Sequence, residues 1–414
     1  MNKKKKIVFV KNFSNLSVNQ GINILVAIIA TPILFQNLGE SSFGLINLSF
    51  SIFILLSIII SYGYHLNGPK HISLITQKNK EKDLINELIS VRIFLAIIVS
   101  LLVILISYFS NFFEGYSTIM LFSIPILWSE AIHPVFYLQG KNNLSVLAIL
   151  NSFSKLIYLA FIIFFIKSSE DAYKVNLIFG VSLFVVYLFF WIKIYLKNRI
   201  NFIWSGFEKL FFRFKENFEF FLSSIAGHIS IHSGLIILKL FVDNLELGKF
   251  ALANRIALLL RMIPVFIIQS VLQNATVISK KNNSDLKEHL NYYYWWGLVI
   301  TFIIGLFFMV FSKWIIMIFS GEEIKYSTQI LSLLSFIPFL AMLNFKNLLI
   351  ILIEEKKRIL NKASWISALV MVTISVNLSY LYGGLGLAFA LLFSEIFSFI
   401  IHSILLSKDN GKKQ

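Results

Sequence analysis

The sequence contains no cysteine. A disulfide framework, a catalytic thiol and a thiolate metal site are therefore all excluded. Charged residues are also scarce, since they make up 14% of the 414 residues, whereas soluble domains carry about 25%. Hydrophobic residues account for 57% of the chain, which is more than a water-soluble surface accommodates. The composition excludes a cytosolic globular protein and predicts a helical protein that crosses a membrane many times.

Short motifs of several enzyme classes are missing as well. The sequence has no phosphate-binding loop G-x-x-x-x-G-K-[ST], no zinc motif H-E-x-x-H and no nucleophile elbow G-x-S-x-G. These absences argue against an ATPase and give no indication of a hydrolase. We expect no catalytic residues, no metal and no cofactor.

Apolar segments can be counted because a membrane helix needs about 20 predominantly apolar residues. Twelve candidates are separated by polar breaks, at residues 14–35, 43–65, 89–109, 117–138, 146–166, 175–196, 219–242, 250–273, 295–319, 328–353, 364–382 and 385–406. The sequence therefore predicts an all-α integral membrane protein. We expect about twelve transmembrane helices in two six-helix bundles around a central cavity.

The longest polar connection divides the predicted spans into two groups of six. We expect an N-terminal bundle at 1–196, a cytoplasmic interfacial linker at 197–218 and a C-terminal bundle at 219–414. In the linker, aromatic and aliphatic residues alternate with basic ones. This pattern is typical of an amphipathic helix that lies in the membrane interface.

The net charge is +16, from 37 basic and 21 acidic residues. On a soluble chain this balance would suggest nucleic acid, so the position of the charges is decisive. If the N-terminus is cytoplasmic, the cytoplasmic segments carry 25 Lys and Arg residues and the opposite side carries four. Basic residues gather on the cytoplasmic side of membrane proteins. The charge therefore predicts topology, with both termini cytoplasmic and an uncleaved first helix, and does not indicate nucleic-acid binding.

Several basic side chains fall inside the apolar segments, where charge is expensive. In the seventh segment, a regular helix would place His228, His232 and Lys239 on one face, because successive residues turn by about 100°. In the eighth, Asn254 and Arg261 are seven residues apart and share a face. The candidate residues for a cationic, substrate-binding cavity are Lys155, Arg261, Arg255, Lys239, His228, His232, Arg92 and Lys346.

Acidic residues do not balance these bases. Away from segment ends, the apolar segments contain Glu130 and Glu395, so the predicted cavity is net positive and attracts anions. Glu130, His133 and Glu395 are candidates for ion coupling. Glu130 and His133 alone are too few ligands for a metal site. The alternative for each base is a structural role, with the side chain reaching the headgroups or hydrogen-bonding a neighbouring helix.

Several short motifs resemble the pattern of Wzx-type O-antigen and polysaccharide flippases, which belong to the multidrug/oligosaccharidyl-lipid/polysaccharide exporter superfamily. The matching stretches are Lys11-Asn12-Phe13, Gln20-Gly21-Ile22-Asn23, Leu38-Gly39, Phe43-Gly44-Leu45-Ile46, Tyr62-Gly63-Tyr64, Phe136-Tyr137-Leu138-Gln139-Gly140, Lys155, Ile166-Lys167-Ser168-Ser169-Glu170-Asp171 and Leu247-Gly248-Lys249-Phe250 with Ala253 and Arg255. The likeness covers essentially the whole chain and is strongest over the first 180 residues.

The resemblance implies a flippase for undecaprenyl-pyrophosphate-linked oligosaccharide, the repeat unit of O-antigen or capsule, in the bacterial cytoplasmic (inner) membrane. It implies a role in polysaccharide and lipopolysaccharide biosynthesis, with a polysaccharide polymerase and a chain-length regulator as partners. Lys155 matches a lysine of the family pattern. Two alternatives remain at this point: an ion-coupled multidrug antiporter of the same superfamily, and a membrane glycosyltransferase or polymerase. The short external loops disfavour the second.

Overall fold

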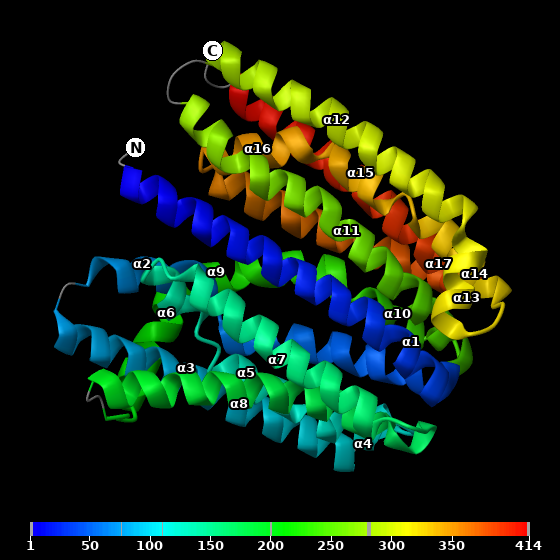
Figure 1. The fold of residues 1–414 in the computed structure, drawn as a ribbon, viewed down its shortest axis with the longest axis horizontal. Helices are drawn as coiled ribbons and strands as arrows, with labels where there is room; N and C mark the ends of the chain where they lie inside the picture. Colours follow the sequence, from blue (N-terminus) through cyan, green and yellow to red (C-terminus); the bar gives the residue numbers. More distant parts are fainter. Residues whose placement is uncertain (1–2, 76, 110, 199–200, 280–282, 412–414) are drawn as a thin grey trace. The chain divides into compact units, whose positions relative to one another are not determined.

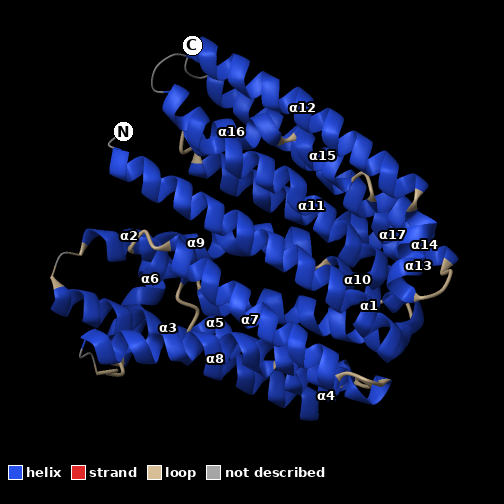
Figure 2. Ribbon diagram, in the orientation of Figure 1, coloured by secondary structure: helices blue, strands red, loops and turns tan. Residues whose placement is uncertain are grey.

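The computed structural model describes residues 3–75, 77–109, 111–198, 201–279 and 283–411. Figure 2 shows helices joined by loops, and no described residue belongs to a β-strand. The chain forms two compact units, Met1–His228 (unit 1) and Ile229–Gln414 (unit 2). The prediction of an all-α fold is therefore confirmed.

Unit 1 contains the elements from α1 to most of α9 (Figure 1). They are α1 (Lys3–Ser61), α2 (Tyr64–Leu74), α3 (Lys78–Phe109), η1 (Asn111–Phe113), α4 (Ser117–Phe122), α5 (Ile124–Ala131), α6 (Val135–Gly140), α7 (Leu144–Phe165), η2 (Ser169–Asp171), α8 (Ala172–Asn198) and α9 (Phe207–His232).

Unit 2 begins within the last turn of α9. Its further helices are α10 (Gly234–Lys239), α11 (Asn244–Ser279), α12 (Asn283–Val310), α13 (Ser312–Ser320), α14 (Lys325–Leu334), α15 (Ile337–Leu343), α16 (Phe345–Ile353) and α17 (Lys357–Gly411).

Nine helical stretches among the described residues are long and apolar enough to cross a membrane. Two of them, Gly21–Leu74 and Lys357–Asp409, have 54 and 53 residues. At 1.5 Å per residue each is about 80 Å long, more than twice the ~30 Å of a hydrocarbon core, so each provides two crossings. The α9–α10 stretch covers the remaining predicted segment, 219–242. The structure thus accommodates all twelve predicted segments.

Glycines divide the two longest stretches. Gly39 (φ 75°, ψ 168°) interrupts α1, and Gly383 (φ 58°, ψ −136°) interrupts α17. A side chain is strained at positive φ, whereas glycine adopts it readily. These positions coincide with the predicted boundaries after residues 35 and 382.

Prolines mark other breaks. Pro125 and Pro134 lie where the fourth segment separates into α4, α5 and α6, and Pro338 is near the start of α15. Pro32 and Pro264 lie inside helices instead. Packing of these short helices is close: a Cβ at Gly180 of α8 would come within 2.6 Å of the Pro125 backbone in α5. The breaks in the fourth segment expose backbone groups that other residues must satisfy.

Candidate functional site

Arg92 of α3 satisfies the backbone at the α5–α6 break. Its Nη1 donates to the His133 carbonyl at 2.8 Å, and its Nη2 donates to the Glu130 carbonyl and, at 3.0 Å, to the Glu130 carboxylate. Arg92 is only 1% exposed and lies 5.7 Å from the centre of the Phe136 ring. The guanidinium therefore neutralises Glu130 and holds two short helices together.

A cavity of about 220 Å³ lies inside unit 1, and we call it the unit 1 cavity. Its described lining residues are Asn23, Ile54, Ser57, Ile126, Ser129, Glu130, His133, Asn151, Lys155, Phe179, Leu183 and Tyr187. Three residues predicted from the sequence, Lys155, Glu130 and His133, are thus brought together. The His133 ring nitrogen Nδ1 lies 3.9 Å from the Glu130 carboxylate. Arg92 contacts this cavity only through Glu130 and His133.

Two further histidines lie near this cluster. His65 of α2 is within electrostatic range of Glu130, Arg92 and His228, and its Nδ1 is 3.1 Å from the Ser61 hydroxyl. His228 donates from Nδ1 to the Ser224 carbonyl at 2.9 Å, the local hydrogen bond of a packed helical histidine. No sequence motif marks His65, because it stands at the very end of the predicted segment 43–65.

In unit 2, Arg261 forms a close ion pair with Glu395, with Nη2 2.5 Å from Oε1. Both line a small cavity of about 10 Å³ together with Asn254. Asn254 and Arg261 therefore share a face of α11, as their spacing predicts. The space holds at most about one water molecule, and Glu395 occupies the position that an anionic ligand of Arg261 would take.

The remaining basic candidates lie apart from these cavities. The Lys346 ammonium lies 4.0 Å from the centre of the Tyr294 ring, a cation–π contact between α16 and α12. Lys239 ends α10 and donates to the Asn244 side chain. The helix is interrupted at Ser233, between α9 and α10, so the regular spacing from His228 to Lys239 does not continue through it.

Two predicted residues, His232 and Arg255, are partly buried in unit 2. Arg255 is on α11, six residues before Arg261 and therefore on a different face of the helix. His232 is the last residue of α9. Neither lines the unit 1 cavity or the small cavity around Arg261.

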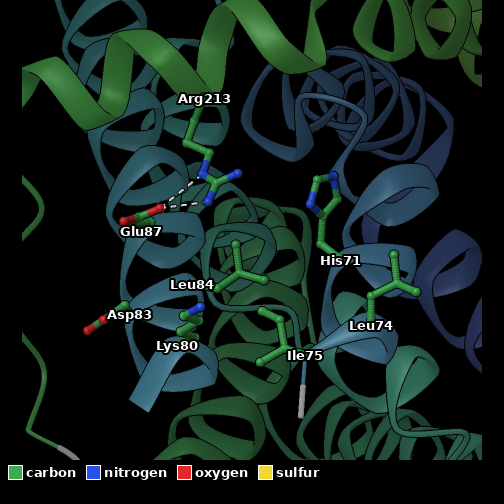
Figure 3. A pocket seen from close by; sticks show the side chains of 8 residues that line it. All are labelled: His71, Leu74, Ile75, Lys80, Asp83, Leu84, Glu87 and Arg213. Atoms are coloured by element: carbon green, nitrogen blue, oxygen red, sulfur yellow. Dashed lines mark hydrogen bonds and ion pairs between the residues drawn. The ribbon is translucent and has the colours of Figure 1, made fainter. Parts of the chain in front are cut away.

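A second cavity of unit 1, of about 330 Å³, lies between α2, the start of α3 and α9 (Figure 3). His71, Leu74 and Ile75 line one side of it, and Lys80, Asp83, Leu84, Glu87 and Arg213 complete the lining. Arg213 donates to Glu87 from Nε at 3.0 Å and from Nη2 at 2.8 Å, as the dashed lines in Figure 3 show.

Glu216 extends this network on α9. It accepts a 2.6 Å hydrogen bond from Arg213 and lies 3.6 Å from His71. Burial alone would lower the pKa of Arg213, but its hydrogen bonds to Glu87 and Glu216 raise that pKa above its ordinary value. The charges around this cavity are therefore largely paired with one another.

The start of α9 is attached to the Tyr62-Gly63-Tyr64 turn, one of the motifs noted in the sequence. The Tyr64 hydroxyl donates to the Arg213 carbonyl at 3.0 Å, and the Asn217 amide donates to the Tyr62 carbonyl. Gly63 has φ 73°, and a Cβ there would come within 2.8 Å of the Phe220 backbone. Gly63 thus permits both the turn and the close approach of α9.

No group of three or more His, Asp or Glu side chains in the described part of the chain is arranged to hold a metal ion. Glu130, His133, Asn151 and Lys155 give the lining of the unit 1 cavity charged and polar groups.

A family model described as "Polysaccharide biosynthesis protein" matches residues 9–273, more than half of the chain. A Shigella dysenteriae protein named "Putative O-antigen transporter" is 23% identical over 395 residues, which cover 93% of this chain and 97% of that protein.

Among solved structures, the lipid II flippase MurJ in an inward closed conformation has a similar fold, with a TM-score of 0.74 and 15% identity over 94% of this chain and 87% of that one. An inward-facing multidrug resistance transporter of the MATE family has a TM-score of 0.69 and 14% identity, covering 93% of this chain and 96% of that chain. The relatives and neighbours named here are transporters and flippases. The chain belongs to the polysaccharide biosynthesis protein family.

Proposed function

We propose that this protein flips an undecaprenyl-pyrophosphate-linked oligosaccharide from the inner to the outer leaflet of the bacterial cytoplasmic membrane. Membership of the polysaccharide biosynthesis family supports a lipid-linked oligosaccharide as the substrate class. In this proposal both termini are cytoplasmic, and the bundles at 1–196 and 219–414 alternate access to a central cationic cavity. A polysaccharide polymerase and a chain-length regulator use the flipped repeat unit.

The observation that carries the proposal is the charge balance of the unit 1 cavity. Glu130 is the only acidic residue among its described lining residues, and Arg92 already compensates its charge. The Lys155 ammonium therefore gives the cavity a net positive charge. In a weakly screened interior such a charge attracts an anion such as diphosphate.

The basic residues of unit 2 extend this proposal. Arg261 binds diphosphate when it exchanges Glu395 for the ligand, because a guanidinium can donate two hydrogen bonds to a carboxylate or a phosphate in the same bidentate geometry. Arg255, Lys239, Lys346 and the histidines His228 and His232 supply further positive charge along the path. A coupling ion that binds at Glu130, His133 or Glu395 influences the arginine–glutamate pairs of the two units.

A multidrug antiporter is less consistent with these contacts. A transporter of organic cations needs a carboxylate in the membrane that is available to a cation or a proton. Here Arg92 pairs with Glu130 and Arg261 pairs with Glu395, so each carboxylate already has a cationic partner. The fold alone does not separate the two functions, because both kinds of transporter share it.

The test is a flipping assay in proteoliposomes that contain a lipid-linked oligosaccharide, with and without proton and sodium gradients. Lys155→Ala should slow flipping by roughly 10- to 100-fold, the equivalent of one charged hydrogen bond, and Lys155→Arg should restore most of it. Lys193→Ala is the matched control, because Lys193 is an exposed lysine of α8 outside the cavity. Flipping by Lys155→Ala at the wild-type rate would contradict the proposal.

A further inference from the structure

The unit 1 cavity has a neutral polar wall in addition to Lys155. Asn151 accepts a 2.7 Å hydrogen bond from the Tyr187 hydroxyl and is also hydrogen-bonded to His133, so two neighbours fix the orientation of its amide. The hydroxyls of Ser57 and Ser129 also line the cavity, each donating to a carbonyl of its own helix and keeping acceptor capacity for a ligand. The cavity therefore presents amide and hydroxyl groups beside the Lys155 ammonium, the Glu130 carboxylate and the His133 ring.

Apolar side chains complete the wall. Phe179 of α8 lines the cavity together with Ile54, Ile126 and Leu183, and its ring is held edge-on by Phe50 and Tyr158 at 5.2 and 5.4 Å. A prenyl chain cannot hydrogen-bond to the amide and hydroxyl groups, and a diphosphate does not pack favourably on the aromatic ring. A pyranose ring can make both kinds of contact, because it carries hydroxyls around its edge and C–H groups on its faces.

The size and position of the cavity narrow the ligand further. Its volume of about 220 Å³ far exceeds the ~10–15 Å³ that one water molecule needs on the same measure, so the cavity can admit a ring-sized ligand. Asn151 and Lys155 are four residues apart on α7, so their Cβ atoms are about 6 Å apart on one face. A ring held at Asn151 therefore adjoins an anionic group held at Lys155.

We infer that the unit 1 cavity is a sugar-binding subsite that receives the ring attached directly to the diphosphate. This inference rests on the proposed function and adds the residues that select the substrate. Asn151 makes the direct hydrogen bonds to the ring, Phe179 covers one face of it, and Tyr187 is a positioning residue that holds the Asn151 amide. A site built to hydrogen-bond a ligand discriminates strongly against ligands that leave its polar groups unpaired.

The experiment measures dissociation constants for the purified protein with a panel of defined lipids. The panel contains undecaprenyl diphosphate without sugar and the same lipid carrying one hexose, one N-acetylhexosamine or one hexuronic acid. The wild-type protein should bind at least one sugar-bearing lipid roughly tenfold more tightly than the bare lipid. Tyr187→Phe and Asn151→Leu should each reduce that ratio to about one, whereas Lys155→Ala should weaken the binding of every lipid in the panel.

Tyr195→Phe is the matched control. Tyr195 also lies on α8 and donates to an asparagine, Asn86, at 2.9 Å, but it does not line the cavity, so this variant should keep the ratio. A wild-type protein that prefers no sugar-bearing lipid, or a Tyr187→Phe variant that keeps the preference, overturns the subsite. If the wild-type protein prefers a sugar but Lys155→Ala binds the bare lipid normally, the diphosphate role of Lys155 fails and the subsite stands.

Discussion

Each unit contains an acidic residue among apolar helices, and the arginine that pairs with it makes different contacts in the two units. In unit 1, Arg92 is buried and divides its hydrogen bonds between the Glu130 carboxylate and two backbone carbonyls. In unit 2, Arg261 is 27% exposed and forms an ion pair with the Glu395 carboxylate. The first arginine is part of the fold, because its bonds replace those lost at a helix break. In our proposal the second arginine can exchange Glu395 for a ligand, because Arg261 is partly exposed to solvent.

The surroundings of Lys155 in unit 1 and of Lys346 in unit 2 also differ. In unit 1 the compensated Glu130 leaves Lys155 as the charge that faces a cavity of about 220 Å³. In unit 2 the cavity beside Arg261 is about 10 Å³, and Lys346 packs on Tyr294. In the proposed mechanism the two units therefore contribute unequally to binding the anionic substrate.

The largest expected effect is on stability in unit 1. Arg92→Ala should lower the free energy of unfolding by about 3–5 kcal/mol, because it removes a buried guanidinium and leaves two backbone carbonyls and the partly buried Glu130 carboxylate without their partner. Thermal unfolding of the purified protein in detergent measures the change. The double variant Arg92→Ala/Glu130→Gln should recover part of the loss, since the uncompensated charge is gone but the carbonyls stay unpaired. Unfolding of Arg92→Ala at the wild-type temperature would show that the pair is dispensable.

Removal of the corresponding arginine in unit 2 should lower the free energy of unfolding by a smaller amount. Arg261→Ala should lower the free energy of unfolding by about 1–2 kcal/mol, between the values for exposed and buried ion pairs, because solvent reaches Arg261. The same unfolding assay compares it directly with Arg92→Ala. Equal losses in the two variants would remove the distinction between a structural and an exchangeable arginine.

A smaller change in the free energy of unfolding is expected for Lys356, at a polar end of the helices of unit 2. Lys356 contacts Glu354 at 2.8 Å and Asp409 at 2.9 Å. Burial alone would lower the pKa of Lys356, but these two carboxylates raise it above its ordinary value. The stabilisation is therefore complete below pH ~10.4, the pKa of an unperturbed lysine, and is lost as the pH rises further.

Lys356→Ala should accordingly lower the free energy of unfolding by about 1 kcal/mol at neutral pH. Unfolding curves of the variant and the wild-type protein between pH 7 and 11 test this. The two proteins should converge only in the most alkaline part of the range. Convergence already at pH 8 would mean that the carboxylates do not raise the pKa of Lys356.

The smallest effect is expected at the surface of unit 1. Lys209 contacts Glu87 at 3.0 Å and is 61% exposed. Lys209→Ala should change the free energy of unfolding by less than about 0.5 kcal/mol, and the difference should vanish at 1 M salt, where the Debye length is about 3 Å. A loss that persists in high salt would mean that the aliphatic part of Lys209 stabilises α9 by packing.

Hydropathy predicted the helical segments well because the requirement for about 20 apolar residues is local to each helix. Helical spacing also placed Asn254 and Arg261 on one face, and both line the same small cavity. By contrast, the partner of a buried arginine is a property of tertiary packing. Glu130 is 38 residues from Arg92, Glu395 is far from Arg261 along the chain, and no sequence pattern links them.

Local exceptions to regular helices limited the rest of the prediction. The stripe from His228 to Lys239 assumed one continuous helix, and the interruption at Ser233 ends that assumption. The Ser233-Gly234 pair is a turn signal that could have indicated it. The cavity beside Arg213 depends on contacts between α2, α3 and α9, which follow from the fold and not from a motif.

The central claim is that Lys155 supplies positive charge to the unit 1 cavity and holds the diphosphate there. The most direct measurement is the dissociation constant of undecaprenyl diphosphate for the wild-type protein, Lys155→Ala and Lys155→Arg, each with an unchanged unfolding temperature. The account predicts that binding weakens roughly 10- to 100-fold in Lys155→Ala and recovers in Lys155→Arg. Equal dissociation constants in all three proteins would contradict it.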